Sequence, residues 1–139
     1  MKNIYIIIAL FAVLVGCQNS SDEEVVPDIS GVYEIHTLHN MQGEVLKFPE
    51  LAADGKVQIT SEIEIARVDD RLINILRKGI AFGTPYTDPL GLFEIRKDGG
   101  NYAVYKDDLY IGTLGSKEVF LNFAGKSQNT MISSIRANR

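Results

Sequence analysis

Apolar and polar residues alternate along most of the chain, most clearly between Val57 and Ile65. The odd positions of this stretch are apolar except for Ser61, whereas the even positions are Gln58, Thr60, Glu62 and Glu64. A helix would scatter the apolar positions around its circumference, but a strand places them on one face. The pattern therefore predicts a half-buried strand over residues 57–65.

Other segments repeat this period of two. They cover residues 31–38, 44–48, 71–78, 91–97, 101–106, 109–114, 118–124 and 130–136. No segment shows the periodicity of an amphipathic helix, although residues 50–55 are compatible with a single helical turn. Eight or nine short strands separated by turn residues are typical of an all-β domain.

Short polar turns predict how neighbouring strands pair. A two-residue turn at 69–70 predicts the pairs Ile63–Leu76, Ile65–Asn74 and Glu62–Arg77. Turns at 99–100 and 107–108 predict the pairs Ile95–Val104, Lys97–Tyr102, Val104–Ile111 and Tyr102–Thr113. One face of these last strands then carries Phe93, Ile95, Tyr102, Val104 and Ile111, and the other carries Glu94, Arg96, Tyr105 and Tyr110.

A row of sequential antiparallel strands leaves two open edges, and exposed edges promote aggregation. Eight or nine strands are enough to close such a meander into a small barrel, which removes the edges. Closure requires the last strand, 130–136, to pair with the first, 31–38. The alternative architecture is a two-sheet β-sandwich.

Residues 4–15 depart from the alternation, because they form an unbroken apolar run behind Lys2. The run is shorter than the roughly 20 residues that a membrane-spanning helix needs, and its layout is that of an export signal. The end of the run and the two residues after it, Leu14-Val15-Gly16-Cys17, resemble the lipobox of bacterial lipoproteins. In that family the signal peptide is cleaved before the cysteine, which becomes acylated. The resemblance implies that residues 1–16 are removed and that Cys17 carries a lipid anchor of palmitate type.

Cys17 is the only cysteine, so an exported form of the chain cannot make an internal disulfide bond. Residues 17–28 are polar, acidic and contain a proline, which is typical of a flexible tether. Gln18 is not the aspartate that commonly retains lipoproteins in the inner membrane, so the resemblance implies the outer membrane. Asp22-Glu23-Glu24 is similar to the acidic signals that send some lipoproteins to the cell surface, although a solvated tether explains these residues equally well. Display on the periplasmic face therefore remains open.

The residues after the tether carry a second resemblance. Gly31-Val32-Tyr33 opens a meander as the Gly-x-Trp motif opens lipocalins and lipocalin-like bacterial lipoproteins. The resemblance implies a small lipocalin-like barrel over residues 29–139, with Arg136 packed on the ring of Tyr33. Tyrosine replaces the tryptophan of the family, and the chain is short for a lipocalin.

Composition limits the remaining possibilities. Without residues 1–16, which contain Lys2 as their one charged residue, the net charge changes from −4 to −5 over a single domain's length. A multidomain enzyme, a polytopic membrane protein and a basic nucleic-acid-binding protein are excluded. The doublets Arg77-Lys78 and Arg96-Lys97 split across the two faces of their strands, so neither predicts a phosphate-binding patch.

Candidate chemical motifs favour no catalytic site, metal or cofactor. Gly125-Lys126-Ser127 imitates the end of a phosphate-binding loop but lacks the earlier glycine of that motif. His36 and His39 lie three apart on a strand and therefore point to opposite faces. The pairs 69–70 and 107–108 fall at turns, where aspartate bonds the backbone.

The sequence therefore predicts a function only through residues that could bind a ligand or a protein partner. Ser61 and Asn74, on an otherwise apolar face, are candidate ligand-binding residues, as are Phe82 and Tyr86 on a long loop predicted over Gly79–Gly91. Glu94, Tyr105 and Tyr110 form a candidate surface for a protein partner. The sequence supports either a carrier of a small apolar or amphipathic ligand or a non-catalytic assembly subunit of the cell envelope.

Overall fold

The computed structural model describes residues 27–124 and 131–139, so the predictions for the signal peptide, for Cys17 and for most of the tether lie outside it. The described residues form ten strands and no helix. The strands are β1 (Gly31–Asn40), β2 (Val45–Lys47), β3 (Glu50–Leu51), β4 (Val57–Arg67), β5 (Leu72–Ala81), β6 (Thr84–Asp98), β7 (Asn101–Lys106), β8 (Leu109–Leu114), β9 (Glu118–Asn122) and β10 (Ile132–Asn138). The part of the chain that the structure covers therefore contains no helix that could cross a membrane.

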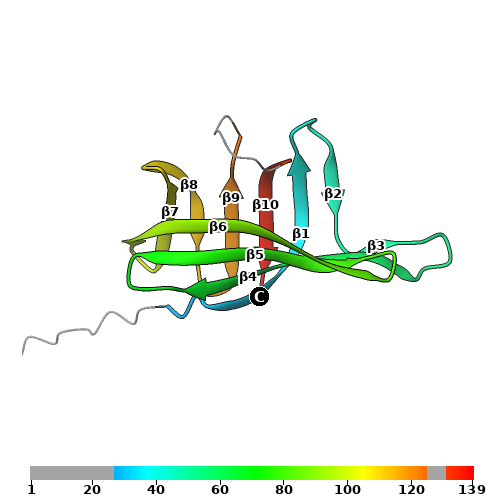
Figure 1. Ribbon diagram of the computed structural model, residues 1–139, viewed down its shortest axis with the longest axis horizontal. Helices are drawn as coiled ribbons and strands as arrows, with labels where there is room; N and C mark the ends of the chain where they lie inside the picture. The colour runs from blue at the N-terminus through cyan, green and yellow to red at the C-terminus, as the bar shows by residue number, and fades with distance from the viewer. Residues whose placement is uncertain (1–26, 125–130) are drawn as a thin grey trace, which may run out of the picture.

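Eight strands close into an antiparallel barrel. The order runs from β1 through β10, β9, β8, β7, β6 and β5 to β4, and β4 pairs back onto β1. In Figure 1, β4, β5 and β6 cross in front of the other barrel strands at a steep angle. The short strands β2 and β3 extend β1 and β4 on the outside of this closure. The predicted small lipocalin-like barrel is confirmed, including the pairing of the last strand with the first, and the sandwich alternative is wrong.

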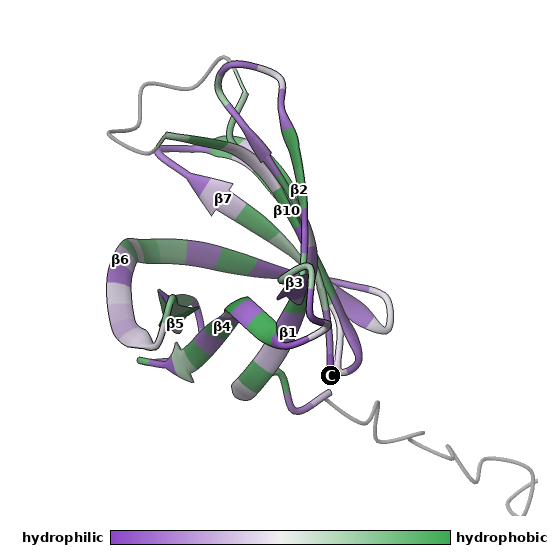
Figure 2. Cartoon of the chain, turned by 90° about the vertical axis from the view of Figure 1, so that its right-hand side faces the viewer, coloured by the Kyte–Doolittle hydropathy of each residue, from purple (hydrophilic) through white to green (hydrophobic). Residues whose placement is uncertain are grey.

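Side chains fill the barrel interior. Hydrophobic and hydrophilic positions alternate along the strands (Figure 2), and the apolar set points inward. Tyr33, Phe93 and Phe123 are the largest completely enclosed side chains. Around them pack Ile29, Ile35, Leu38, Ile63, Ile65, Ile73, Ile75, Ile95, Val104, Ile111, Leu121 and Ile135. The centre of the barrel is therefore a packed core.

The predicted register between β4 and β5 is wrong by one residue. Ile63 lies opposite Arg77, and Ile65 lies opposite Ile75. The connection is longer than a two-residue turn, because the carboxylate of Asp69 accepts hydrogen bonds from the backbone N–H groups of Arg71 (2.7 Å) and Leu72 (2.8 Å). A shift of one residue exchanges the two faces of a strand. Arg77 therefore lies on the inner face of β5 rather than on the outer face.

The next two hairpins follow the predicted registers more closely. β6 and β7 pair as expected, with Ile95 opposite Val104. The two-residue turn at 107–108 is also present, and both aspartates have positive φ, as a type I′ turn requires. A β-bulge after Val104 then places that residue opposite Gly112 instead of Ile111, and Tyr102 opposite Leu114 instead of Thr113. A Cβ atom at Gly112 would lie 1.9 Å from the carbonyl oxygen of Phe120, so glycine is needed where β8 approaches β9.

Two segments differ from the structure expected for them. The long loop predicted over Gly79–Gly91 is wrong, because β5 and β6 continue through it to a tight turn at Phe82-Gly83. Phe82 and Gly83 both have positive φ, at 51° and 80°, which matches the right-handed twist of the flanking strands. The single helical turn considered for residues 50–55 is also wrong, since β3 begins at Glu50.

The aromatic residue at the start of β1 has a different cationic partner from the one expected. The guanidinium of Arg139 lies 5.2 Å from the centre of the Tyr33 ring. Arg136 instead lies over Phe120, at 4.9 Å, and is exposed. Since Ile135 and Ala137 point inward, the alternation of β10 directs Arg136 outward, and the chain reaches Tyr33 only beyond the end of the strand.

Candidate functional site

Past their pairing at Glu34–Glu62, β1 and β4 separate, and this end of the barrel is termed the open end. Two of the predicted ligand-binding residues meet there. Ser61 and Tyr86 both lie opposite Gly79, one on each neighbouring strand. The Tyr86 hydroxyl lies 2.8 Å from the Ser61 hydroxyl and 3.1 Å from the carbonyl oxygen of Thr60. A Cβ atom at position 79 would lie 2.6 Å from the Tyr86 hydroxyl oxygen, so glycine leaves room for the tyrosine to cross β5.

The other two residues do not join this group. Asn74 lies opposite Ala66 and Leu92, which are both exposed, so it belongs to the outer face of the barrel. The register shift in β4 and β5 is the reason, because the sequence prediction had placed Asn74 opposite Ile65. Phe82 lies at the tip of the β5–β6 hairpin and is 72% exposed, which keeps it out of the interior.

Arg77 is the residue that the sequence prediction missed. It points into the barrel beside Ile63, and its guanidinium lies 5.2 Å from the centre of the Tyr86 ring. One Nη atom forms an ion pair with Asp88 at 3.2 Å. The Nε atom is buried and has no hydrogen-bond partner. A signal was present in the sequence, because the other odd positions of β5 are Ile73, Ile75, Gly79 and Ala81, and an arginine on such an apolar face is unusual.

A cavity of about 410 Å³ lies at this open end, in front of Arg77 and Asp88. Its remaining wall comes from the opposite side of the barrel and consists of Leu38, Asn40, Gln42, Leu46, Met131 and Ile132. The volume is within the usual range for small-molecule sites, and the wall combines apolar side chains with a few polar groups. This composition suits a ligand with one polar end and one apolar end.

A second cavity opens where β1 and β4 separate. It measures about 300 Å³ and is lined by Glu34, Ile35, His36, Phe48, Pro49, Val57, Thr60, Ser61 and Glu62. Ser61 therefore contributes to this cavity, while its partner Tyr86 lies against Arg77, which lines the first. The Ser61–Tyr86 pair stands between the two spaces.

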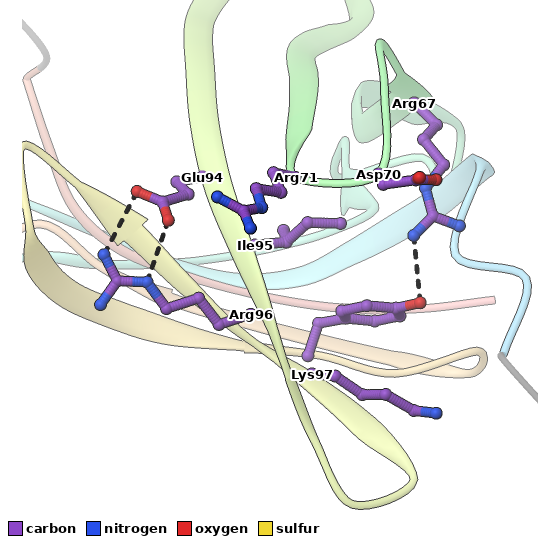
Figure 3. Close-up of a pocket in the computed structure, with 8 residues that line it drawn as sticks. Arg67, Asp70, Arg71, Glu94, Ile95, Arg96 and Lys97 are labelled. Atoms are coloured by element: carbon purple, nitrogen blue, oxygen red, sulfur yellow. Dashed lines mark hydrogen bonds and ion pairs between the residues drawn. The ribbon is translucent and has the colours of Figure 1, made fainter. Parts of the chain in front are cut away.

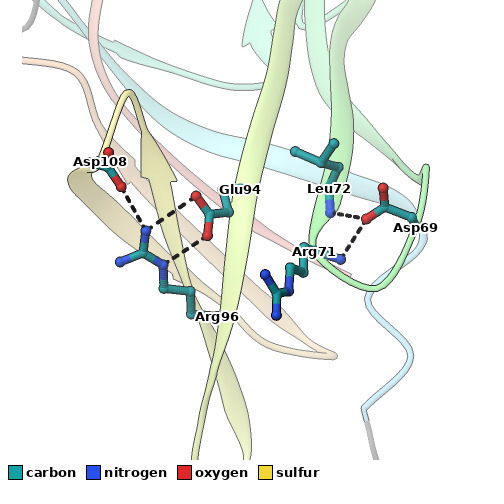
Figure 4. A network of polar contacts seen from close by, with 6 residues as sticks. All are labelled: Asp69, Arg71, Leu72, Glu94, Arg96 and Asp108. Carbon is teal, nitrogen blue, oxygen red and sulfur yellow. Dashed lines mark hydrogen bonds and ion pairs between the residues drawn. The ribbon is translucent and has the colours of Figure 1, made fainter.

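The candidate partner residues gather on the outer face of β6, β7 and β8. Glu94 accepts hydrogen bonds from Arg96 at 3.0 and 3.3 Å (Figure 3), and Asp108 accepts one at 2.9 Å (Figure 4). The hydrogen bonds to Glu94 and Asp108 raise the pKa of Arg96 above its ordinary value. The guanidinium of Arg96 lies 4.1 Å from the centre of the Tyr105 ring, which in turn packs edge-on against Tyr110 at 5.8 Å.

The described residues contain no group of three or more histidine, cysteine, aspartate or glutamate side chains that could hold a metal ion. Neither a family model, nor a curated protein, nor a solved structure matches the chain.

Proposed function

We propose that the protein is an exported, lipid-anchored lipoprotein of the cell envelope whose barrel binds a small amphipathic ligand at its open end. The lipobox-like sequence Leu14-Val15-Gly16-Cys17 supports the anchor. The cavity in front of Arg77 supports the binding of the ligand.

The state of Arg77 is the observation that carries the ligand proposal. Buried polar groups are normally hydrogen-bonded, and leaving one unsatisfied costs about 1–3 kcal/mol. Arg77 has such an atom, Nε, and its one ion pair within the described residues is with Asp88, whose side chain is 43% exposed. An anionic head group entering the cavity would provide the acceptor that Arg77 lacks, after a small rotation of its side chain.

The apolar end of the ligand would contact the opposite wall of the cavity. Leu38 and Ile132 are buried there, whereas Leu46 and Met131 are 41% and 78% exposed. Exposed apolar side chains around a cavity are typical of binding sites. Because the centre of the barrel is packed, the ligand would lie across the open end rather than deep inside.

The experiment compares two probes of equal chain length, dodecanoate and dodecyltrimethylammonium, by calorimetric titration below their micellar concentrations. The protein is the full chain in a non-ionic detergent. We expect dodecanoate to bind and the cation not to bind. Arg77→Gln should weaken dodecanoate binding about tenfold or more, as expected for the loss of a charge-assisted hydrogen bond.

Asp88→Asn is the matched variant with the opposite expectation. It removes the carboxylate that competes for Arg77, so dodecanoate should bind more tightly. A general defect in folding would weaken binding in both variants. Arg136→Gln, on the outer face, is the control and should leave the affinity unchanged. Equal binding of the two probes, or no effect of Arg77→Gln, would contradict the proposal.

The anchor is tested separately by Cys17→Ser. We expect cells to label the natural chain, but not the variant, with an alkyne analogue of palmitate. The variant should also leave the membrane fraction as a folded domain. A variant that still needs detergent for extraction would contradict lipidation at Cys17.

A role as an envelope assembly subunit is the second candidate. The outer face around Glu94 and Tyr105 supports it, because Leu109 and Tyr110 are each 52% exposed beside this network. Aromatic and arginine side chains are enriched in protein interfaces. Tyr110→Ala should then abolish cross-linking of the chain to an envelope protein in intact cells and leave dodecanoate binding unchanged.

A further inference from the structure

A third hollow lies at the opposite end of the barrel, beside the β4–β5 hairpin. It arises because β6 is longer than β5: β5 begins at Leu72, opposite Glu94, and β6 continues to Asp98. The hollow measures about 720 Å³, and Ile95 and Tyr102 contribute to its wall. Figure 3 shows the side chains of Arg67 and Arg71, from the β4–β5 hairpin, and those of Arg96 and Lys97, from β6, around this hollow.

The hollow is positively charged although the chain as a whole is acidic. Four cationic side chains line it, namely Arg67, Arg71, Arg96 and Lys97, against the carboxylates of Asp70 and Glu94. Glu94 is already bound on both oxygens by Arg96, which also holds Asp108 (Figure 4). Arg96 thereby holds both of these carboxylates, and within the described residues neither of them pairs with the two arginines of the β4–β5 hairpin.

Arg67 is held in position for binding by contacts with uncharged groups. Its Nη2 atom donates a hydrogen bond to the Tyr102 hydroxyl at 3.0 Å, and its Nε atom donates one to the carbonyl oxygen of Asp69 at 3.3 Å. The guanidinium also packs against the Tyr102 ring at 5.4 Å. Since the Tyr102 hydroxyl accepts from Arg67, its own proton remains to be donated to a ligand.

Arg71 is the second arginine of the hollow. Its backbone is fixed, because its N–H donates to Asp69 and its carbonyl oxygen accepts from the N–H of Ile95 at 2.7 Å. Among residues 27–124 and 131–139, neither Arg67 nor Arg71 forms an ion pair. Two guanidinium groups with free charge and a hydroxyl donor in one hollow match a tetrahedral oxyanion, because guanidinium donors bind phosphate oxygens in pairs.

From this arrangement we infer that the hollow binds a phosphate monoester through Arg67 and Arg71, with Tyr102 as a further donor. The phosphate could belong to a soluble metabolite or to a lipid head group, since both present the same tetrahedral anion. This inference is independent of the ligand at Arg77, which lies at the other end of the barrel.

The test is a calorimetric titration of the full chain in non-ionic detergent with inorganic phosphate, glucose 6-phosphate, and dimyristoyl phosphatidic acid in mixed micelles. We expect inorganic phosphate to bind weakly and to compete with whichever ester binds more tightly. Tighter binding of glucose 6-phosphate would indicate a soluble ligand, and tighter binding of the phosphatidic acid would indicate a head group. Absence of binding by all three probes would overturn the inference.

Variants locate the site. Arg71→Gln changes an exposed side chain that forms no hydrogen bond or ion pair with the described residues, and it should weaken phosphate binding about tenfold without changing stability. Arg67→Gln should do the same but also lower stability, because it loses the contacts with Tyr102. Asp70→Asn should strengthen binding by removing the opposing carboxylate. Lys56→Gln, on a distant exposed loop, is the charge-matched control. Binding that is unaffected by both arginine variants would overturn the inference.

Discussion

Tyr33 is the central buried residue at the end of the barrel where β1 pairs with β4. It is completely buried, and its hydroxyl lies within hydrogen-bond distance of the carbonyl oxygens of Ile29 (3.0 Å) and Gly115 (3.1 Å). Arg139 covers the ring and donates hydrogen bonds to the carbonyl oxygens of Ser30 and Asp28. The Tyr33 side chain thereby connects the N-terminal and C-terminal segments of the domain with the β8–β9 turn.

A double-mutant cycle should detect this connection. Tyr33→Ala should cost about 3 kcal/mol of unfolding free energy, because it removes a large buried ring. Arg139→Ala should cost about 1 kcal/mol, and the pair should be coupled by about 0.5–2 kcal/mol. Urea unfolding measures all four free energies. Arg136→Ala serves as the control and should be additive with Tyr33→Ala, so coupling at Arg136 instead of Arg139 would contradict the structure.

The same tyrosine predicts a loss of stability in alkaline solution. Burial raises the pKa of Tyr33 above its ordinary value of 10.0, against the opposing effect of the Arg139 charge. A raised pKa in the folded state means that the neutral hydroxyl stabilises the fold. This contribution is fully present below pH 10 and is lost as the pH rises through the folded-state pKa.

Tyr33→Phe removes the ionisable group and should therefore reduce the alkaline dependence. We expect the unfolding free energy of the natural chain to fall more steeply than that of the variant between pH 10 and pH 11.5, with equal slopes below pH 9. The other tyrosines are common to both proteins and cancel in the comparison. Equal slopes above pH 10 would show that ionisation of Tyr33 does not affect stability.

At the scale of elements, the β4–β5 hairpin decides which side chains enter the barrel. Its register places Ile65 against Ile75 in the core and Ile63 against Arg77 near the open end. On the outer face, Glu64 forms an ion pair with Lys78. A register shifted by one residue would move Arg77 to the outside and would eliminate the binding site proposed at the open end.

Aspartate substitutions distinguish the two registers. Ile65→Asp should destabilise the domain by more than about 3 kcal/mol, because it buries a charge against Ile75. Ile63→Asp should cost measurably less, since Arg77 lies opposite as a partner. The difference should disappear in an Arg77→Met background. Thermal unfolding measures the series, with Glu64→Lys as a surface control that costs about 1 kcal/mol or less. Equal effects of the two aspartates in both backgrounds would favour the shifted register.

At the scale of the whole molecule, β1 both completes the barrel and borders its open end. The first half of β1 pairs with β4 and completes the barrel, whereas its second half pairs with β2. β4 likewise leaves β1 and pairs with β3 at its beginning. The two short strands therefore lie where β1 and β4 separate, beside the cavities lined by Ser61 and Arg77.

Hydrogen exchange should reflect this division. Each of β2 and β3 has a single neighbouring strand, is short and is exposed throughout, so its amides should exchange with low protection. Amides in the paired parts of β7, β9 and β10 have neighbours on both sides and should exchange only by global unfolding. Equal protection of Leu46 and Leu121 would show that the open end is as rigid as the core.

The sequence by itself determined the architecture, because alternation and turn chemistry are local. The period of two separated the inward and outward faces, and the turns at 99–100 and 107–108 specified their hairpins. It also placed Glu94, Arg96 and Tyr105 together on the outer face, where the structure shows them in contact. The sequence also placed Ser61 on the inner face, whereas it assigned Tyr86 to a loop that is in fact part of β6.

Only the tertiary structure decided which charged residues serve the two ends of the barrel. Arg77 faces the interior because Asp69 lengthens one turn, and a change of one residue in a turn exchanges every face of the strand that follows. Arg139 rather than Arg136 reaches Tyr33, because the alternation of β10 directs Arg136 outward. The hollow beside Arg67 and Arg71 exists because two neighbouring strands differ in length. The contact between Arg139 and Tyr33 joins the two ends of the domain's sequence. It therefore depends on closure of the whole barrel, which no local pattern contains.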